Sequence, residues 1–342
     1  MTATDTSTAL QAGESSELLR VDDLVKHFPA GRGLFRAAGH VRAVDGISFT
    51  MHKGETLGIV GETGCGKSTT GRILAGFLPS TSGQVIFDGR DLDEARRSDR
   101  RRLNREIQMI FQDPYSALNP RHTVGTIISA PFRYQGITPP GGTRNAVQQL
   151  LEQVGLNPEH FNRYPQEFSG GQRQRICVAR AIALRPKLII ADEPVSALDV
   201  SVRAQVINLL SDLRDEQGIA YLFIAHDLSV VRHISDRVAV MYLGKIMELA
   251  ENDLLYSQPK HPYTRALLSA VPIPNPHERS QRLRLQGEPP SPLNPPSGCH
   301  FRTRCWKAQS ICETTEPPLA GDARHQVACH FPEDAPVAAS SP

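Results

Sequence analysis

The chain has 342 residues, of which 39% are hydrophobic and 22% are charged, and its formal net charge is +2. At roughly 150 residues per domain, this length predicts one large domain with an appendage, or two modest domains. The near-neutral charge disfavours a general nucleic-acid binder, because such proteins attract phosphates through a strong positive field. The longest apolar run, Ile219 to Ala225, is far shorter than the roughly 20 residues of a membrane-spanning helix. The N-terminus has no basic start and no apolar stretch, so we expect a cytoplasmic chain.

Composition divides the chain into four parts. Residues 1–17 are rich in Thr, Ser and Ala and hold little apolar surface, so we expect a disordered leader. Residues 18–270 alternate short β-branched runs with amphipathic stretches, which predicts an α/β domain whose parallel sheet is covered on both faces. Residues 271–298 hold eight prolines and are typical of a strap, and residues 299–342 form a tail with four of the six cysteines.

A glycine-rich segment follows the apolar run Thr56 to Val60, which predicts a buried strand, and precedes a predicted helix from Thr69 to about Gly76. In this context a G-x-x-x-x-G-K-[ST] pattern binds phosphate. Backbone N–H groups would converge on phosphate oxygens, Lys67 would neutralise the β- and γ-phosphates, and Ser68 would ligate Mg²⁺. We expect Cys65 to pack as a small side chain. The loop consists of Gly61, Glu62, Thr63, Gly64, Cys65, Gly66, Lys67, Ser68 and Thr69.

Two adjacent carboxylates, Asp192 and Glu193, follow the apolar run Lys187 to Ala191. Ligands bind at the carboxyl ends of strands in open α/β sheets, so both side chains are placed to act on a bound nucleotide. We expect Asp192 to hold Mg²⁺ through water and Glu193 to orient or deprotonate the attacking water. An Asp-Glu-Pro sequence alone is also typical of a turn, but the phosphate loop favours the catalytic interpretation.

Two further polar residues end predicted strands. His226 follows Ile219 to Ala225 and is placed to hydrogen-bond the γ-phosphate, although a single histidine at a strand end is more often structural. Gln112 follows Ile107 to Phe111 and would lie beside the metal ion. Because parallel strands end at the same edge of a sheet, we expect both side chains near the two carboxylates.

A second anion-binding motif lies between these elements. Phe168 precedes Ser169-Gly170-Gly171-Gln172, and an apolar-periodic stretch from Ile176 to Leu184 predicts a helix after it. Ser169 is typical of an N-cap, and the two glycines leave backbone N–H groups open to another phosphate. A chain with one phosphate loop and one such helix start therefore carries two partial phosphate-binding sites, each of which is half of a complete site.

In their order, these motifs resemble those of the nucleotide-binding subunits of ABC transporters. The resemblance implies an ATP-hydrolysing α/β P-loop NTPase of the ABC type, with a helical subdomain at about 113–180 and a small Cys-rich C-terminal extension. Two ATP molecules would lie between two subunits, and Ser169, Gly170, Gly171 and Gln172 would bind the partner's ATP. Asp199, in Ser196-Ala-Leu-Asp199, would lie in the dimer loop. An aromatic residue would stack on adenine, with Phe28 as the preferred candidate and Phe35 as the alternative.

Two segments outside the ATP motifs, Asp113 to Pro120 and His261 to Ala270, resemble the dipeptide, oligopeptide and nickel importer ATPases. An insertion from Gly31 to His40 resembles the F-type member of their ATPase pair. The resemblance implies a sister ATPase, two membrane-spanning subunits, an external solute-binding protein and no nucleic acid. The chain would then be peripheral on the cytoplasmic face of the membrane, and residues 113–163 would receive the membrane subunits.

Three alternatives stay open. The cargo of such an importer could be nickel or glutathione instead of a peptide. A soluble ABC protein of DNA repair or the ribosome is disfavoured, because those proteins usually fuse two ATPase units or insert long coiled coils. A subunit that binds ATP without hydrolysing it is disfavoured by the intact Glu193 and His226.

The tail holds four cysteines with the spacing C-x₅-C-x₆-C-x₁₆-C, namely Cys299, Cys305, Cys312 and Cys329. Disulfides are uncommon in a reducing compartment, so clustered thiols favour a metal. Zinc sites usually use C-x₂₋₄-C pairs, which this tail lacks, whereas a [4Fe-4S] cluster tolerates wider spacing. The peptide-importer ATPases that the chain resembles carry such a cluster. We therefore expect an iron–sulfur site, with zinc and unliganded or disulfide-linked thiols as alternatives.

Charged and apolar residues flank these cysteines. Arg302 and Arg304 would offset the negative charge of a thiolate cluster. Phe301, Trp306 and Ile311 would exclude water from it. We expect the site to be structural, because a small tail beside a Pro-rich strap needs a metal to hold it together.

Overall fold

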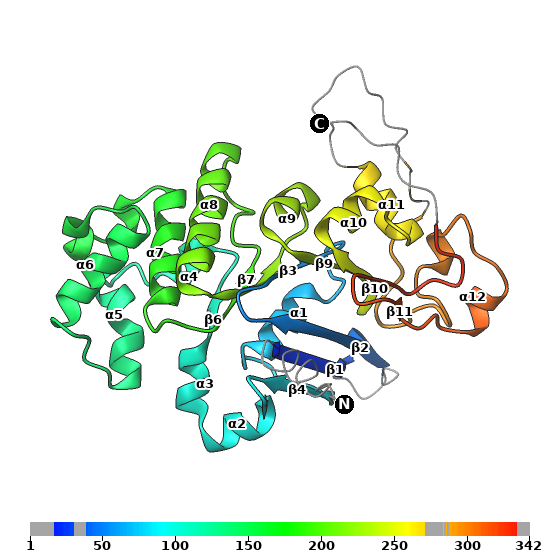
Figure 1. Cartoon of the computed structure of the whole chain (residues 1–342), viewed down its shortest axis with the longest axis horizontal. Coiled ribbons are helices and arrows are strands. Elements are labelled where there is room, and N and C mark those ends of the chain that lie inside the picture. Colours follow the sequence, from blue (N-terminus) through cyan, green and yellow to red (C-terminus); the bar gives the residue numbers. More distant parts are fainter. Residues whose placement is uncertain (1–16, 31–38, 271–282, 284, 286, 334–342) are drawn as a thin grey trace, which may run out of the picture.

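The computed structural model describes residues 17–30, 39–270, 283, 285 and 287–333 (Figure 1). The predicted leader, residues 1–17, lies outside this part except for Glu17, which begins the first strand. Phe35 also lies outside it, as does most of the insertion from Gly31 to His40. Within the described residues, no helix has the length and apolar character needed to span a bilayer.

The central element is an eight-stranded sheet. Its strands lie in the order β11-β12-β10-β9-β3-β8-β7-β6; the five from β9 to β6 are parallel, and each of the other three is antiparallel to its neighbour. The four predicted strands are confirmed, with ends displaced by at most one residue. The strands are β3 (Thr56–Val60), β6 (Ile107–Ile110), β7 (Leu188–Asp192), β8 (Ala220–Ile224), β9 (Arg237–Tyr242), β10 (Lys245–Glu251), β11 (Ala320–Gly321) and β12 (His325–Val327).

Alternate residues of the parallel strands face two different cores. In β7, Ile190 packs in the core shared with the second sheet, whereas Ile189 packs in the core under the helices. In β8, Leu222 and Phe223 divide in the same way. Because both faces are covered, these strands carry almost no polar side chains, which is why continuous apolar runs predicted them.

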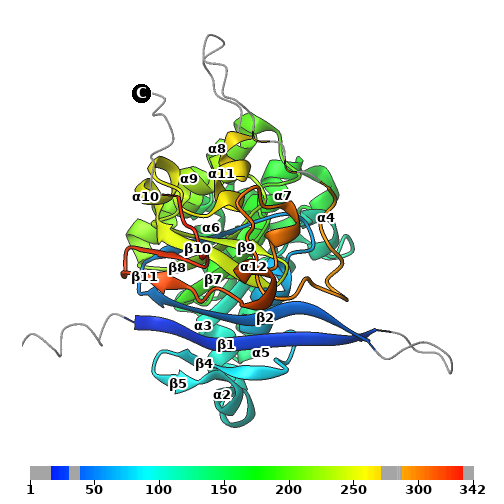
Figure 2. The same ribbon diagram turned by 90° about the vertical axis from the view of Figure 1, so that its right-hand side faces the viewer.

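A second, four-stranded antiparallel sheet forms a separate layer beside the larger one (Figure 2). Its strands, in the order β2-β1-β4-β5, are β1 (Glu17–Ala30), β2 (Gly39–His52), β4 (Ser82–Phe87) and β5 (Arg90–Asp91). Helix α1 (Lys67–Leu74) packs in the core between the two sheets. The prediction of a parallel sheet alone was therefore incomplete. Register shifts such as the one between Val21 and Leu24 interrupt the alternation that would have revealed β1.

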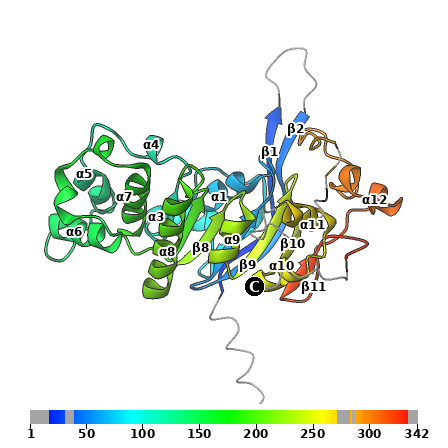
Figure 3. The same cartoon turned by 90° about the horizontal axis from the view of Figure 1, so that it is seen from above.

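Helices cover the other face of the large sheet and extend to one end of the molecule. Figure 3 shows α5, α6 and α7 at that end and α12 at the opposite end. The segment 113–182 is helical, close to the predicted subdomain at about 113–180. The remaining helices are α2 (Leu92–Ser98), α3 (Arg100–Glu106), α4 (Pro114–Ala117), α5 (Val124–Gln135), α6 (Thr143–Gln153), α7 (Gly170–Ile182), α8 (Val200–Gln217), α9 (Leu228–Ile234), α10 (Asn252–Ser257), α11 (Pro262–Ser269), α12 (Ile311–Thr314), and the 3₁₀ turns Pro158–Asn162, Pro165–Glu167 and Arg302–Arg304.

Residues 287–333, here called the C-terminal extension, are joined directly to the eight-stranded sheet. Strand β12 pairs with β10, with Glu248 opposite Val327 and Ala250 opposite His325. Part of the strap predicted at residues 271–298 lies outside the described residues, and the predicted tail supplies two strands to the main sheet. Because it supplies two strands of the main sheet, it is held by backbone hydrogen bonds as well as by side-chain packing.

One buried carboxylate ties this end of the sheet together. Glu248 is fully buried, and its carboxylate lies 2.6 Å from Nε2 of His325 and accepts hydrogen bonds from the backbone N–H groups of Lys260 and His261. His261 caps α11 by accepting the N–H of Tyr263 at Nδ1 (3.0 Å). Strands β10 and β12 and the start of α11 therefore share one polar cluster.

Burial of His261 predicts a loss of stability in mild acid. Burial lowers the pKa of its imidazole from 6.5 to about 4, and Glu248 opposes this shift only in part. Because the unfolded chain takes up the proton near pH 6.5 and the folded chain does not, stability falls as the pH drops from about 6.5 to about 4. We expect His261 to contribute about 2 kcal/mol of this loss between pH 6.5 and pH 4.5.

The variant His261→Asn isolates this contribution, because asparagine keeps an N-cap acceptor but does not titrate. Urea unfolding of both proteins across this pH range should show that the free energy of unfolding falls less steeply with decreasing pH in the variant. If the free energy of unfolding falls equally in both proteins, the assignment to His261 is wrong.

Candidate active site

The phosphate loop connects β3 to α1 and is shaped by its glycines. Gly66 is the N-cap of α1 with φ 109°, and a Cβ atom there would lie 2.1 Å from the carbonyl oxygen of Ala43. A Cβ atom on Gly61 would lie 2.1 Å from the carbonyl oxygen of Met241. The neighbouring strands therefore admit only glycine at both positions. The helix begins at Lys67, two residues before the predicted start, because Gly66 supplies the left-handed cap.

Lys67 lies folded over the loop. Its side chain is buried, and Nζ donates to the carbonyl oxygens of Gly61 (2.7 Å) and Glu62 (3.1 Å). The ammonium group is thus held at the centre of the loop, where a β- or γ-phosphate would be neutralised. Cys65 is buried beside it, and burial raises the pKa of its thiol, which agrees with a packing role.

Ser68 and Asp192 meet at the carboxyl edge of the sheet. The hydroxyl of Ser68 donates to Oδ1 of Asp192 at 2.7 Å, although the two residues are 124 positions apart in the sequence. Burial raises the pKa of Asp192, and the hydrogen bond from Ser68 opposes this shift. A hydroxyl and a carboxylate are the oxygen ligands that Mg²⁺ takes beside nucleotide phosphates, so the pair fits that ion.

Glu193, Gln112 and His226 form a second group at this edge. Glu193 Oε2 accepts from Nε2 of Gln112 at 2.9 Å, and its Oε1 lies 3.3 Å from Nδ1 of His226. The predicted convergence at the strand ends is therefore observed, with Gln112 bonded to Glu193. Glu193 has φ 49°, a left-handed conformation that is uncommon outside glycine and recurs at functional sites.

The motif Ser169-Gly170-Gly171-Gln172 opens α7 as predicted. Ser169 is the N-cap, its hydroxyl accepts the N–H of Gln172, and the Gln172 side chain accepts the N–H of Ser169. Ser169 is exposed. Within the described part of the chain, no hydrogen bond or ion pair joins this motif to the phosphate loop. Asp199, the N-cap residue of α8, is also exposed and makes no capping bond with its side chain.

Phe28 lies in β1 opposite Val41 of β2. It is half-buried, and Nζ of Lys26 lies 5.1 Å from the centre of its ring. Two residues further along β2, the carbonyl of Ala43 is the group that closely approaches Gly66 of the phosphate loop. The strand pair that carries Phe28 therefore passes the loop. Its role in binding adenine stays a prediction.

Two residues that hold the phosphate loop were missed by the sequence analysis. Tyr263 Oη accepts the backbone N–H of Glu62 at 3.0 Å, and Arg304 pairs with the Glu62 carboxylate at 2.9 Å. Arg304 was expected to offset the charge of a thiolate cluster, whereas the structure pairs its guanidinium with Glu62. Arg302 donates to Ser297 instead. Tyr263 lies in the segment His261 to Ala270, which the sequence analysis had singled out. That segment indicated the family and gave no indication of the contact with Glu62.

The four cysteines of the extension lie near one another. Burial is the main cause that raises the pKa of Cys299 and Cys329 to about 11, and the neighbouring thiols contribute. Among the residues that the structure describes, no three His, Cys, Asp or Glu side chains are arranged to hold a metal ion, so neither zinc nor an iron–sulfur site gains support. Phe301 is fully buried, but Trp306 (48% exposed) and Ile311 (41% exposed) do not shield the thiols as expected.

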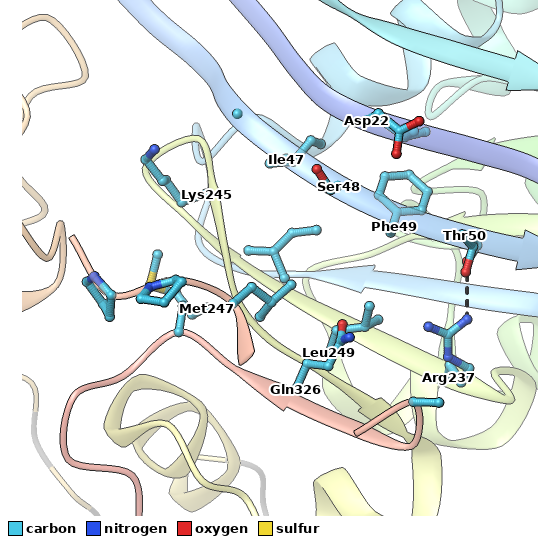
Figure 4. Close-up of a pocket in the computed structure, with 18 of the residues that line it drawn as sticks. Asp22, Ile47, Ser48, Phe49, Thr50, Arg237, Lys245, Met247, Leu249 and Gln326 are labelled. Atoms are coloured by element: carbon cyan, nitrogen blue, oxygen red, sulfur yellow. Dashed lines mark hydrogen bonds between the residues drawn. The ribbon is translucent and has the colours of Figure 1, made fainter. Parts of the chain in front are cut away.

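A cavity of about 780 Å³ lies between β2, β10 and the C-terminal extension (Figure 4). Its lining includes none of the phosphate-loop, Asp192–Glu193 or Ser169–Gln172 residues. The charged groups at its wall already have partners: Lys245 pairs with Glu316, Arg324 with Glu251, and Arg237 with Glu55. The cavity therefore lies at the interface between the C-terminal extension and the two sheets, and it is separate from the phosphate loop and the carboxylates at the sheet edge.

The loop, the paired carboxylates and the parallel strands that carry them define a P-loop nucleotide hydrolase. The family model described as ABC transporter matches residues 44–196, and the one described as oligopeptide/dipeptide transporter, C-terminal region, matches residues 247–312. The chain is 52% identical to the oligopeptide transport ATP-binding protein AppF of Bacillus subtilis over 94% of this chain and 99% of that protein. It is 52% identical to OppF of Salmonella typhimurium (91% and 95% covered) and 48% identical to the dipeptide transport ATP-binding protein DppF of Escherichia coli (91% and 93%).

Solved structures agree with this relationship. The cbiO1 subunit of the cbiONQ ABC transporter complex from Clostridium perfringens is 27% identical, with a TM-score of 0.62 over 70% of this chain and 91% of that chain. The ATP-binding cassette MJ0796, in a dimeric post-hydrolysis state bound to ADP and Pi, is 25% identical, with a TM-score of 0.61 over 69% and 99%. The chain belongs to the family of ABC transporter ATP-binding proteins and is an ATPase that uses ATP and Mg²⁺.

Proposed function

We propose that this chain is the ATP-hydrolysing motor subunit of a dipeptide or oligopeptide importer. The observation that carries the proposal is the extent of the likeness to ATP-binding proteins named for peptide transport. That likeness covers more than nine-tenths of the chain, including the C-terminal region, which ATP chemistry does not require. Nickel or glutathione import and a soluble, non-transport role are less favoured, because no relative reported above is named for them.

The proposed assembly holds this chain on the cytoplasmic face of the cell membrane. Its partners would be a sister ATPase, two membrane-spanning subunits and, through them, an external solute-binding protein. Residues 113–163 would receive the membrane subunits. Tyr134, near the end of α5, supports this placement, because 76% of its surface is exposed. No nucleic acid is expected.

We assign the chemical step to the groups at the sheet edge. Glu193 would orient or deprotonate the attacking water, since Gln112 and His226 hold its two carboxylate oxygens. Lys67 would bind the β- and γ-phosphates, and Ser68 and Asp192 would hold Mg²⁺, which neutralises phosphate charge when bound. Gln112 would also face the metal. Phe28 would stack on adenine, at the strand pair beside the loop.

We further propose that each ATP is bound by two subunits. The signature Ser169-Gly170-Gly171-Gln172 opens α7 with an exposed N-cap, Ser169, and among the described residues no hydrogen bond or ion pair joins it to the phosphate loop of the same chain, so it suits an ATP held by the partner. Asp199, exposed at the start of α8, suits the dimer loop. Hydrolysis would then require the sister ATPase.

Replacing the proposed base should stop hydrolysis but not ATP binding. Glu193→Gln keeps the hydrogen bond from Gln112 and removes the negative charge, so we expect the turnover number of the assembled complex to fall by about 100-fold or more. ATP should then trap a closed dimer, which gel filtration detects. Glu216→Gln, an exposed carboxylate at the end of α8, is the control. Unchanged turnover for Glu193→Gln would remove Glu193 from this role.

The proposed function itself is tested by assembly. The chain is purified alone and then with the membrane subunits and the sister ATPase encoded nearby, and ATP hydrolysis is measured with the binding protein and peptides of two to five residues. Stimulation by peptide in the full assembly alone is expected. Stimulation by nickel or glutathione instead would identify a different cargo. Strong hydrolysis without any stable association with membrane proteins would support a soluble role.

We also propose a [4Fe-4S] cluster on Cys299, Cys305, Cys312 and Cys329, with a structural role. The presence of four cysteines in one small extension, where burial and the neighbouring thiols raise the pKa of Cys299 and Cys329, supports it, and a cluster of several irons tolerates wide ligand spacing. When bound, the cluster would cross-link the extension.

Anaerobic purification followed by iron analysis and an ultraviolet–visible spectrum tests this proposal. We expect four irons per chain and a broad absorption band that is lost in Cys312→Ser. Zinc in place of iron, or no metal at all, would contradict it.

A further inference from the structure

The phosphate loop contains a carboxylate at a position that its sequence pattern leaves open to any residue. Glu62 is the second residue of the loop, and 25% of its side chain is exposed. A negative charge at this position would repel ATP unless another group neutralised it, since charges interact strongly in a partly buried site. The neutralising group comes from the far end of the sequence.

Arg304, in the C-terminal extension, is that group. Its Nη1 donates to both carboxylate oxygens of Glu62, at 3.0 and 2.9 Å, across 242 positions of sequence. Only 8% of the Arg304 side chain is exposed, and the same nitrogen lies 3.5 Å from Oη of Tyr242. Its buried Nε finds no hydrogen-bond partner among the described residues, so Glu62 is the main polar anchor of this guanidinium.

The rest of Glu62 is fixed at the same time. Its N–H donates to Tyr263 Oη at 3.0 Å, and its carbonyl accepts from Nζ of Lys67 at 3.1 Å. Tyr263 packs against Phe301, with ring centres 5.3 Å apart, and Phe301 accepts the N–H of Arg304 at its carbonyl. The side chain and backbone of one loop residue are therefore both bound to a single cluster built from the extension, β9 and α11.

We propose that Arg304 is a positioning residue for ATP: it neutralises Glu62 and holds the first turn of the phosphate loop, so that nucleotide affinity depends on the C-terminal extension. The inference concerns the ATPase site and does not depend on the cargo. It differs from a purely structural role, in which Arg304 would attach the extension without affecting nucleotide binding.

Equilibrium binding of a non-hydrolysable MgATP analogue to the full-length chain tests the proposal, with ATPase kinetics as a second readout. We expect Arg304→Gln to raise the Kd for the analogue and the KM for ATP by about tenfold, with a much smaller change in kcat. The matched control is Arg302→Gln. Arg302 lies in the same 3₁₀ turn but bonds to Ser297 and faces Glu313, so its Kd should stay within twofold.

A rescue separates neutralisation from structural damage. In the double variant Glu62→Gln with Arg304→Gln, no uncompensated carboxylate remains, so the Kd should return to within about threefold of wild type. An Arg304→Gln protein with unchanged Kd would overturn the proposal, and so would a loss of affinity that the second substitution does not restore.

If Arg304→Gln fails to fold, Arg304→Lys provides the test. Lysine keeps the positive charge beside Glu62, so the Kd should stay within about threefold of wild type. A tenfold loss in this folded variant would show that charge is not what Arg304 supplies, and would overturn the proposal.

Discussion

Parallel pairing of β3, β7 and β8 is the constraint on which the active site depends. Because these three strands run in the same direction in adjacent positions, the residues that follow them emerge at one edge. The phosphate loop follows β3, the two carboxylates end or follow β7, and His226 follows β8. The hydrogen bond between Ser68 and Asp192 is a direct product of that register, since Asp192 lies opposite Ile224 at the end of its neighbour.

The two cores preserve this register. A one-residue slip of β7 would exchange Ile189 and Ile190 between the core under the helices and the core around α1. Both cores are filled by side chains of defined shape, so such a slip would misplace buried groups on both faces at once. The position of Glu193, which has a left-handed backbone conformation, is thus set by the packing of β7 in the two cores, at some distance from the catalytic groups.

Local patterns predicted the parts of the site that lie at strand ends. Asp192, Glu193, His226 and Gln112 were each recognisable because an apolar run preceded a polar residue, and the sheet brings them together. The antiparallel layer was missed, since the register shifts of β1 break its alternation. The pairing of Glu62 with Arg304 and that of β10 with β12 had no local signal, because each joins segments far apart in the sequence. Long-range contacts of this kind depend on the folded topology and not on any one segment.

The pairing of β12 with β10 also affects the order in which the chain can fold during synthesis. Glu248 leaves the ribosome long before His325, so until His325 is made the Glu248 carboxylate lacks the imidazole that lies 2.6 Å from it in the folded chain. The backbone N–H groups of Lys260 and His261 can bond to this carboxylate earlier, but they carry no ionisable group, so its burial is less well compensated until His325 is present. The nascent ATPase domain therefore exposes one edge of its sheet until nearly the whole chain has been made, which is the stage at which a chaperone would be most needed.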